Sequence, residues 1–213
     1  NTALISKEED LTFEKYVQDV TSIVDYAKKD SRFTEIHLLG HSEGALIMAI
    51  AAQKSDVNSL LSIAGAGRPA DKVLMEQLAA SLPPNLLLES ENVLQQMKAG
   101  NKVGKVSPEL QSLFRPSVQP YMISWLKYNP QQEISKVKVP ILILQGKMDI
   151  QITEEDAENL QSANDKAQLF YSDNMNHVLK DVQGSREQNI ASYSNPNLPL
   201  ASGLLDEIVK FIK

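Results

Sequence analysis

The feature that most constrains this chain is an apolar run that ends in Gly-His-Ser-Glu-Gly and continues into small and apolar residues. Residues 36–40 form the apolar run, and residues 43–53 have the composition of a buried helix. A strand that reverses directly into a helix holds the residue between them, Ser42, in a strained conformation. We expect glycine at positions 40 and 44 to relieve a collision with the backbone there. The Ser42 hydroxyl would then stand at a helix N-terminus, which favours a developing negative charge.

Hydrophobic patterning on both sides of this turn predicts a parallel α/β sheet. Helix-like and strand-like stretches alternate along the chain, as expected when helices connect parallel strands. Ser6 and Glu9 form a plausible capping box at the start of the first helix. The predicted strands are residues 35–40, 58–65, 137–144 and 167–171, and the predicted helices are residues 7–29, 43–53, 153–162 and 204–212.

A long stretch between the second and third predicted strands has a different character. Residues 67–136 contain three helix-like segments and no convincing strand. One crossover between parallel strands needs only a dozen or so residues. We therefore expect a helical cap inserted between residues 1–66 and residues 137–213, which together form the core domain. The alternative is an ordinary run of crossover helices.

Composition excludes several classes of protein. The chain has 213 residues, is 42% hydrophobic and carries a net charge of −6, which suits one sizeable core and no nucleic-acid surface. It has no cysteine, only three histidines and no apolar run long enough to span a membrane. We expect no metal and no cofactor. The compartment stays open, with the cytoplasm slightly favoured over secretion or the periplasm.

Three residues follow predicted strands and complement one another chemically. In open parallel sheets, catalytic groups lie just past the carboxyl ends of the strands. Ser42, Asp149 and His177 satisfy that rule and occur in this order. A serine needs a base, a neutral imidazole can serve as one near pH 7, and a carboxylate orients the imidazole. The sequence therefore predicts a nucleophile, an acid and a base, although Asp149 alone is compatible with a simple turn and His177 with a surface loop.

Other polar residues near these positions have simpler interpretations. Asp156 is a rival acid, but its place inside a helix favours a solvated face. His37 lies within a strand and is expected to be a packed or edge residue. His41 is adjacent to Ser42, so its side chain should point away from the hydroxyl. We expect His41 to shape the floor of a pocket rather than to act as the base.

These motifs carry a family resemblance. From about Leu11 to its end, the chain resembles the α/β-hydrolase superfamily through G-H-S-E-G, P-I-L-I-L-Q-G-K-M-D and an Asn-His loop before a final helix. More narrowly, it is similar to cap-bearing bacterial carboxylesterases and serine aminopeptidase-like hydrolases. The resemblance implies that Ser42 is the nucleophile, Asp149 the acid and His177 the base. It also implies that the backbone N–H of Glu43 is one of two oxyanion donors.

The chain departs from that pattern before the elbow formed by Gly40, His41 and Gly44. The family places about four strands ahead of this point, and here only one predicted helix precedes Ile36. The loop that gives the second oxyanion donor is then missing, and one such donor is worth about 100- to 1000-fold in rate. Ile36, Leu38 and Leu39 would lie on an apolar open edge. We expect a missing N-terminal segment or a dimer partner at this edge, with a natural minimal sheet as the alternative.

The sequence therefore predicts a serine hydrolase that cleaves small carboxylic esters through an acyl-enzyme. Few charges among the expected pocket residues favour an uncharged group, although the same side chains would also suit plain cap core. The alternatives are an aminopeptidase or thioesterase with the same residues, with Glu43 as a candidate partner for a substrate ammonium, and a non-catalytic fragment that pairs through its open edge. The expected pocket residues are Met75, Leu86, Tyr121, Met122 and Trp125.

Overall fold

A four-stranded sheet organises the fold. The computed structural model describes residues 7–213, and in it the strands are all parallel in the order β1-β2-β3-β4. The predicted α/β class and parallel sheet are confirmed. The third strand begins later than predicted, after Pro140, because proline has no N–H to give to a strand ladder. The strands are β1 (His37–His41), β2 (Ser59–Ile63), β3 (Ile141–Gly146) and β4 (Ala167–Ser172).

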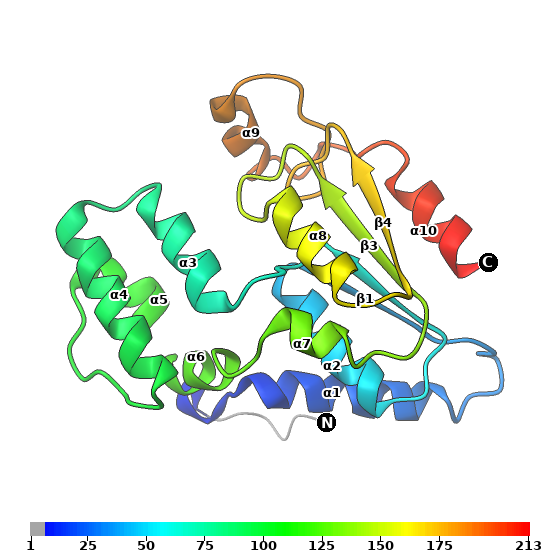
Figure 1. Ribbon diagram of the computed structural model, residues 1–213, viewed down its shortest axis with the longest axis horizontal. Helices are drawn as coiled ribbons and strands as arrows, with labels where there is room; N and C mark the ends of the chain where they lie inside the picture. Colours follow the sequence, from blue (N-terminus) through cyan, green and yellow to red (C-terminus); the bar gives the residue numbers. More distant parts are fainter. Residues whose placement is uncertain (1–6) are drawn as a thin grey trace.

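Helices cover both faces of the sheet (Figure 1). On one face lie α2 (Glu43–Lys54) and α8 (Glu154–Ser162), with α1 (Phe13–Ala27) packed on α2. On the other face, α10 (Leu204–Ile212) packs its apolar side on β2 and β3. The expected helix over residues 7–29 is split into a short 3-10 helix, Glu8–Asp10, and α1, which begins after Thr12. The expected capping box includes Ser6, which lies outside the described residues.

Alternation along the strands builds two separate apolar cores. Leu60, Ile141 and Ile143 face α2 and join the large core, in which α2 itself is buried on nearly all sides. Leu61 and Leu144 face the opposite way and pack under α10. Strand side chains alternate between the two faces, so a sheet covered on both sides requires nearly continuous apolar strands.

The segment between β2 and β3 is helical throughout its regular parts. In Figure 1 most of its helices stand to one side of the sheet, and α7 returns to pack against α2 and α8. At the start of α1, the backbone N–H of Phe13 donates to Ser124 Oγ on α6 (2.8 Å), and the Phe13 ring stacks on Trp125. The helices are α3 (Ala70–Ala79), α4 (Pro84–Lys98), η2 (Pro108–Leu110), α5 (Gln111–Phe114), α6 (Gln119–Trp125) and α7 (Pro130–Ile134).

Three short helices, α5, α7 and a helix after β4, were not predicted from the helical pattern. In the polar stretch after β4, α9 (Arg186–Ser192) begins with a capping box between Ser185 and Gln188. The helix α7 is capped by the side chain of Asn129. Both capped helices are too short for apolar periodicity to reveal them, and their capping residues are the only local indication.

Strand β1 forms one edge of the sheet. Among residues 7–213, β2 is the one strand that pairs with β1. Leu39 is 43% exposed there, as expected. The expected exposure of Leu38 is wrong, because Leu38 points to the opposite face, packs in the core beneath α1 and α2, and is only 6% exposed.

Asp156 is a correction to the sequence interpretation. Its side chain is fully buried rather than solvated on a helix face. It accepts hydrogen bonds from the backbone N–H groups of Gly67 and Arg68, and from the Arg68 guanidinium at 2.9 and 2.8 Å. Burial alone would raise the pKa of Asp156, but the hydrogen bonds from Arg68 and Thr153 outweigh it and hold the pKa below its usual value. Asp156 thus links α8 to Gly67 and Arg68, where the chain passes from β2 into the helical segment.

We expect Asp156→Asn to destabilise the protein by about 3 kcal/mol at pH 7, because it leaves Arg68 without its buried partner. Urea unfolding measures the loss, and Glu155→Gln, at an exposed neighbouring position, is the matched control. The lowered pKa means that the Asp156 contribution is present above the unfolded-state value of about 3.9 and disappears as the pH falls through the folded-state value. Equal stability of the two variants at pH 7 would contradict this role.

The turn from β1 into α2 depends on Gly40. A Cβ at Gly40 would lie 2.2 Å from the backbone oxygen of Gly44, so the expected steric need for glycine is confirmed there. The same expectation is wrong for Gly44, where an added Cβ would meet nothing within 4 Å. Gly44 lies in the first turn of α2, and its Cβ direction points away from the strand end.

We therefore expect Gly40→Ala to cost about 3 kcal/mol or more in unfolding free energy, because the backbone must shift to accept the methyl group. Gly44→Ala is the matched control and should stay within about 1 kcal/mol of the wild type, with helix propensity favouring alanine. Chemical denaturation of the two variants side by side tests this difference. Similar stabilities would show that Gly40 is not the steric pivot of the turn.

Candidate active site

Ser42 occupies the strained point between β1 and α2. Its backbone has φ 55° and ψ −123°, a region that non-glycine residues rarely adopt. Its N–H donates to the carbonyl of Ile63 on β2 (2.9 Å), and its carbonyl accepts from Ala45 in α2 (3.0 Å). The conformation expected from the sequence is confirmed, and it holds the hydroxyl beyond the end of the strand.

Asp149 lies in the turn that follows β3, with its carboxylate buried. One oxygen, Oδ1, accepts from the backbone N–H groups of Gln151 (2.8 Å) and Ile152 (3.0 Å). The other oxygen, Oδ2, lies 2.8 Å from Nδ1 of His177. The two backbone bonds fix the carboxylate and leave Oδ2 directed at the imidazole.

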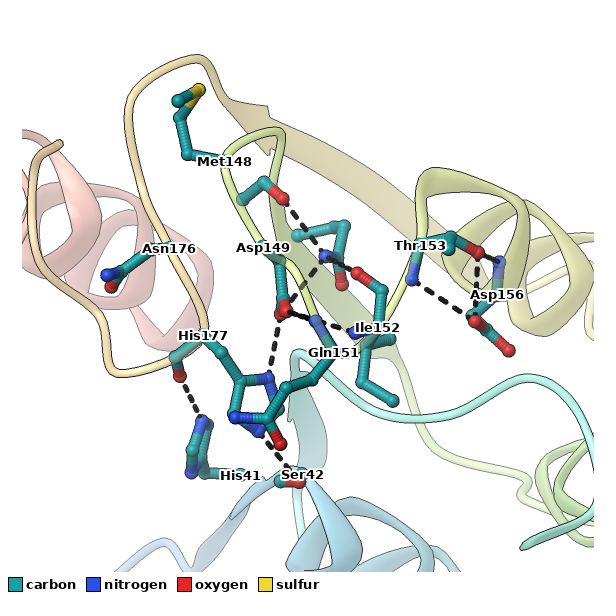
Figure 2. Close-up of polar contacts among 12 residues, drawn as sticks. His41, Ser42, Met148, Asp149, Gln151, Ile152, Thr153, Asp156, Asn176 and His177 are labelled. Carbon is teal, nitrogen blue, oxygen red and sulfur yellow. Dashed lines mark hydrogen bonds and ion pairs between the residues drawn. The ribbon is translucent and has the colours of Figure 1, made fainter. Parts of the chain in front are cut away.

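His177 links the other two residues (Figure 2). Its Nε2 is 3.0 Å from Ser42 Oγ, although the two residues are 135 positions apart in the chain. An ionised carboxylate only accepts hydrogen bonds, so Nδ1 carries a proton toward Asp149. In the neutral ring, Nε2 is then the acceptor for the Ser42 hydroxyl. The structure thus brings together the three residues that the sequence singled out.

The loop that carries His177 is braced by Asn176, which sequence reasoning did not identify. The Asn176 side chain is buried, donates to Asn189 Oδ1 (2.9 Å) and Ser192 Oγ (2.7 Å) on α9, and accepts from the N–H of Lys180 (3.0 Å). These bonds close a tight turn around His177. The chance of recognising this role from sequence was small, because its partners lie in a helix that was itself not predicted.

His41 contacts the same loop from the other side. Its Nε2 lies 2.7 Å from the carbonyl oxygen of His177, and the two rings are 4.9 Å apart (Figure 2). Burial lowers the pKa of His41. The side chain therefore contacts the loop that carries His177, whereas other residues line the cavity where His41 was expected to form the floor.

A cavity of about 210 Å³ opens beside Ser42. Of the expected pocket residues, only Trp125 lines it. Tyr121 and Met122 are buried in the core, and Met75 and Leu86 pack against that core. The lining residues are Ser42, Glu43, Leu46, Ala66, Arg68, Ala70, Val73, Leu74, Gln77, Trp125, Pro130, Gln151 and Ile152.

Glu43 brings a carboxyl group to this cavity. Its Oε1 accepts a hydrogen bond from the Tyr121 hydroxyl of α6, so the first residue of α2 is joined to the helical segment. Burial raises the pKa of Glu43, against the opposing effect of the Tyr121 hydrogen bond. Its backbone N–H has no partner within the helix, because Glu43 is the first residue of α2.

Two of the polar side chains that line the cavity already have partners. The Arg68 guanidinium is held by Asp156 and Glu76, and the Gln77 amide donates to the backbone carbonyl of Gln151 (3.2 Å). The remaining wall is mostly apolar. Such a cavity suits a substrate group with an apolar body and few hydrogen-bond acceptors of its own.

Among residues 7–213, no group of three or more histidine, aspartate or glutamate side chains is arranged to hold a metal ion. None of the helices in this part of the chain is long and apolar enough to cross a membrane.

Comparison with known proteins places this geometry in a family. The model of the serine aminopeptidase S33 family matches residues 11–181. Esterase EstD of Thermotoga maritima is 26% identical over 182 residues, and this match covers 82% of the chain but only 42% of EstD.

Solved structures share the fold at low sequence identity. A lipase-esterase related protein from Clostridium acetobutylicum is 18% identical with a TM-score of 0.52, covering 88% of this chain and 76% of that one. Est1E from Butyrivibrio proteoclasticus is 18% identical with a TM-score of 0.55, covering 94% and 72%. Another structure of Est1E, at 16% identity and a TM-score of 0.56, contains ferulic acid, and there the match covers 87% and 67%. With its α/β fold and the family match over most of its length, the chain belongs to the serine aminopeptidase S33 family of α/β-hydrolases.

Proposed function

We propose that this chain carries the catalytic residues of a serine hydrolase that cleaves small carboxylic esters. The observation that carries the proposal is the hydrogen-bonded series from Asp149 through His177 to Ser42, placed at the mouth of a cavity. Each contact has the distance and the donor-acceptor sense that nucleophilic catalysis by serine requires.

In the proposed reaction, His177 Nε2 takes the proton of Ser42 as Oγ attacks the ester carbonyl. The carbonyl oxygen becomes an oxyanion and receives a hydrogen bond from the free N–H of Glu43. The resemblance to α/β-hydrolases suggests that a second donor comes from a segment beyond the open edge of β1. His177 then returns the proton to the departing alcohol, which leaves an acyl group on Ser42.

Water completes the cycle by the same groups. His177 takes a proton from a water molecule, and the resulting hydroxide attacks the acyl carbonyl. Collapse of the second tetrahedral intermediate releases the carboxylic acid and restores the Ser42 hydroxyl. Throughout, Asp149 stabilises the protonated imidazole and keeps Nδ1 oriented.

The cavity supports a small and mainly apolar substrate group. An apolar cavity of about 150 Å³ accepts a benzene ring, so the 210 Å³ beside Ser42 is large enough for an aromatic or short aliphatic group. The curated relative EstD is an esterase by name, and Est1E has been solved with ferulic acid. These relatives support ester substrates, and we propose that residues 67–136 act as a cap that closes the cavity.

Replacing the nucleophile or the acid tests the proposal. We expect Ser42→Ala to reduce kcat for an aryl acetate by roughly 10⁴- to 10⁶-fold, because the nucleophile is lost, and Asp149→Asn by roughly 10⁴-fold, because His177 loses the acceptor that orients its ring. Asp173→Asn, on an exposed residue of the loop after β4 that pairs with Lys147, is the matched control. A fluorophosphonate should add one mass increment to the wild type and none to Ser42→Ala. Full hydrolysis by Ser42→Ala would contradict the mechanism.

An aminopeptidase is the second candidate, and the Glu43 carboxyl at the cavity is the observation that favours it. In that case, Glu43 would bind the ammonium of an amino-acyl substrate beside the scissile carbonyl. A hydrogen bond to a charged group is worth about 1.5–3 kcal/mol, or roughly 10- to 150-fold in rate.

The ratio of two rates separates the candidates. We expect the wild type to hydrolyse an aryl acetate much faster than an amino-acyl anilide, and Glu43→Gln to keep the same ratio between them, because the amide side chain can still accept from Tyr121. A selective loss of anilide hydrolysis in Glu43→Gln by roughly 10-fold or more would favour the aminopeptidase. Rates normalised to fluorophosphonate-titrated sites correct for inactive protein.

A further inference from the structure

The loop that carries His177 is held by more contacts on the side of Asp149 than on the side of Ser42. On the side of the acid, it is held by the bridge between Met175 and Asp181, by the bond from Met148 N–H to the Met175 carbonyl (3.1 Å) and by the Asn176 side chain. On the side of the nucleophile, residues 7–213 provide two hydrogen bonds, from the Ser42 hydroxyl to His177 Nε2 and from His41 to the His177 carbonyl. The first of these is the bond that the reaction itself changes.

His41 therefore makes the hydrogen bond between β1 and this loop that persists throughout the reaction. A carbonyl oxygen only accepts, so the proton of His41 must lie on Nε2. That N–H is present whether the ring is neutral or charged, and the bond persists while His177 gains and loses its proton. Burial lowers the pKa of His41, which favours the uncharged ring beside His177, whose ring is 4.9 Å away.

We propose that His41 is a positioning residue, whose Nε2–H holds the backbone of His177 so that its imidazole stays in reach of Ser42. This inference rests on the proposed serine hydrolase mechanism. Because His41 and Ser42 are consecutive, the end of β1 then supplies both the nucleophile and the residue that positions His177. A reacting group that moves by about 1 Å loses on the order of 100-fold in rate, so this bond controls kcat rather than substrate binding.

Two amide variants that differ by one methylene test the bond. His41→Gln places an amide N–H near the position of Nε2, whereas the shorter side chain in His41→Asn does not reach the His177 carbonyl. For an aryl acetate, we expect His41→Asn to lower kcat by roughly 10- to 100-fold with little change in KM, and His41→Gln to regain most of that loss. His37→Gln is the matched control on the same strand, because His37 bonds to Ser59 Oγ away from the site.

A spectroscopic measurement tests the inference without relying on activity. The chain has only three histidines, so the histidine variants assign their ring resonances directly. Long-range ¹H–¹⁵N spectra of the 213-residue wild type at pH 7 should show a neutral His41 with its proton on Nε2. In His41→Asn, the ring resonances of His177 should shift or broaden, whereas in His41→Gln they should stay close to the wild type.

The outcomes are distinct. A His41 proton on Nδ1, equal kcat losses in the two amide variants, or an undiminished kcat in a folded His41→Asn would overturn the positioning role. An inactive wild type that forms no fluorophosphonate adduct would instead count against the proposed hydrolase function, and the tautomer of His41 and the His177 resonances would still decide whether the contact positions the loop.

Discussion

The close approach of strand β1 to helix α2 is the constraint on which the site depends. Because Gly40 has no side chain, the carbonyl of Gly44 can pass within 2.2 Å of the place where a Cβ would stand. The chain can then reverse within one residue, and Ser42 takes a conformation with φ 55°. This places a hydroxyl, a free N–H on Glu43 and the start of a helix at one point in space. Asp149, in the turn after β3, and His177, in the loop after β4, then reach that point from other strands of the same sheet.

The parallel sheet supplies that reach. The carboxyl ends of β1, β3 and β4 lie at the same end of the sheet. Residues that are far apart in the chain but follow these strands therefore come close together. This explains why Ser42, Asp149 and His177 could be identified from the sequence, since each is marked locally by a strand followed by a turn. The fold class could be predicted for the same reason, because apolar periodicity and strand ends are local properties of the chain.

Two of the features that sequence reasoning missed, the burial of Asp156 and the contact of His41, depend on partners far away in the chain. Helix position alone made Asp156 look solvated, and only the contact with Arg68, 88 residues earlier, explains its burial. The role of His41 could not be seen because its partner is a backbone carbonyl 136 residues later. Tyr121 and Met122 were predicted to line the pocket, with plain core as the alternative, and they lie in the core. Apolar spacing does not distinguish such side chains from one such as Trp125 that lines the cavity.

Polar contacts, rather than apolar area alone, set the position of the helical segment over the site. Asp156 holds its first residues, Tyr121 bonds to Glu43 beside Ser42, and Ser124 accepts from the backbone at the start of α1. Apolar packing tolerates small sliding movements, whereas a buried hydrogen bond is lost when its partners separate, at a cost of about 1–3 kcal/mol for each group left unpaired. Bonds at these separate points therefore fix both the position and the orientation of the segment. The shape of the cavity beside Ser42 follows from that restraint, because the cavity is lined by residues of the core and by residues of the helical segment.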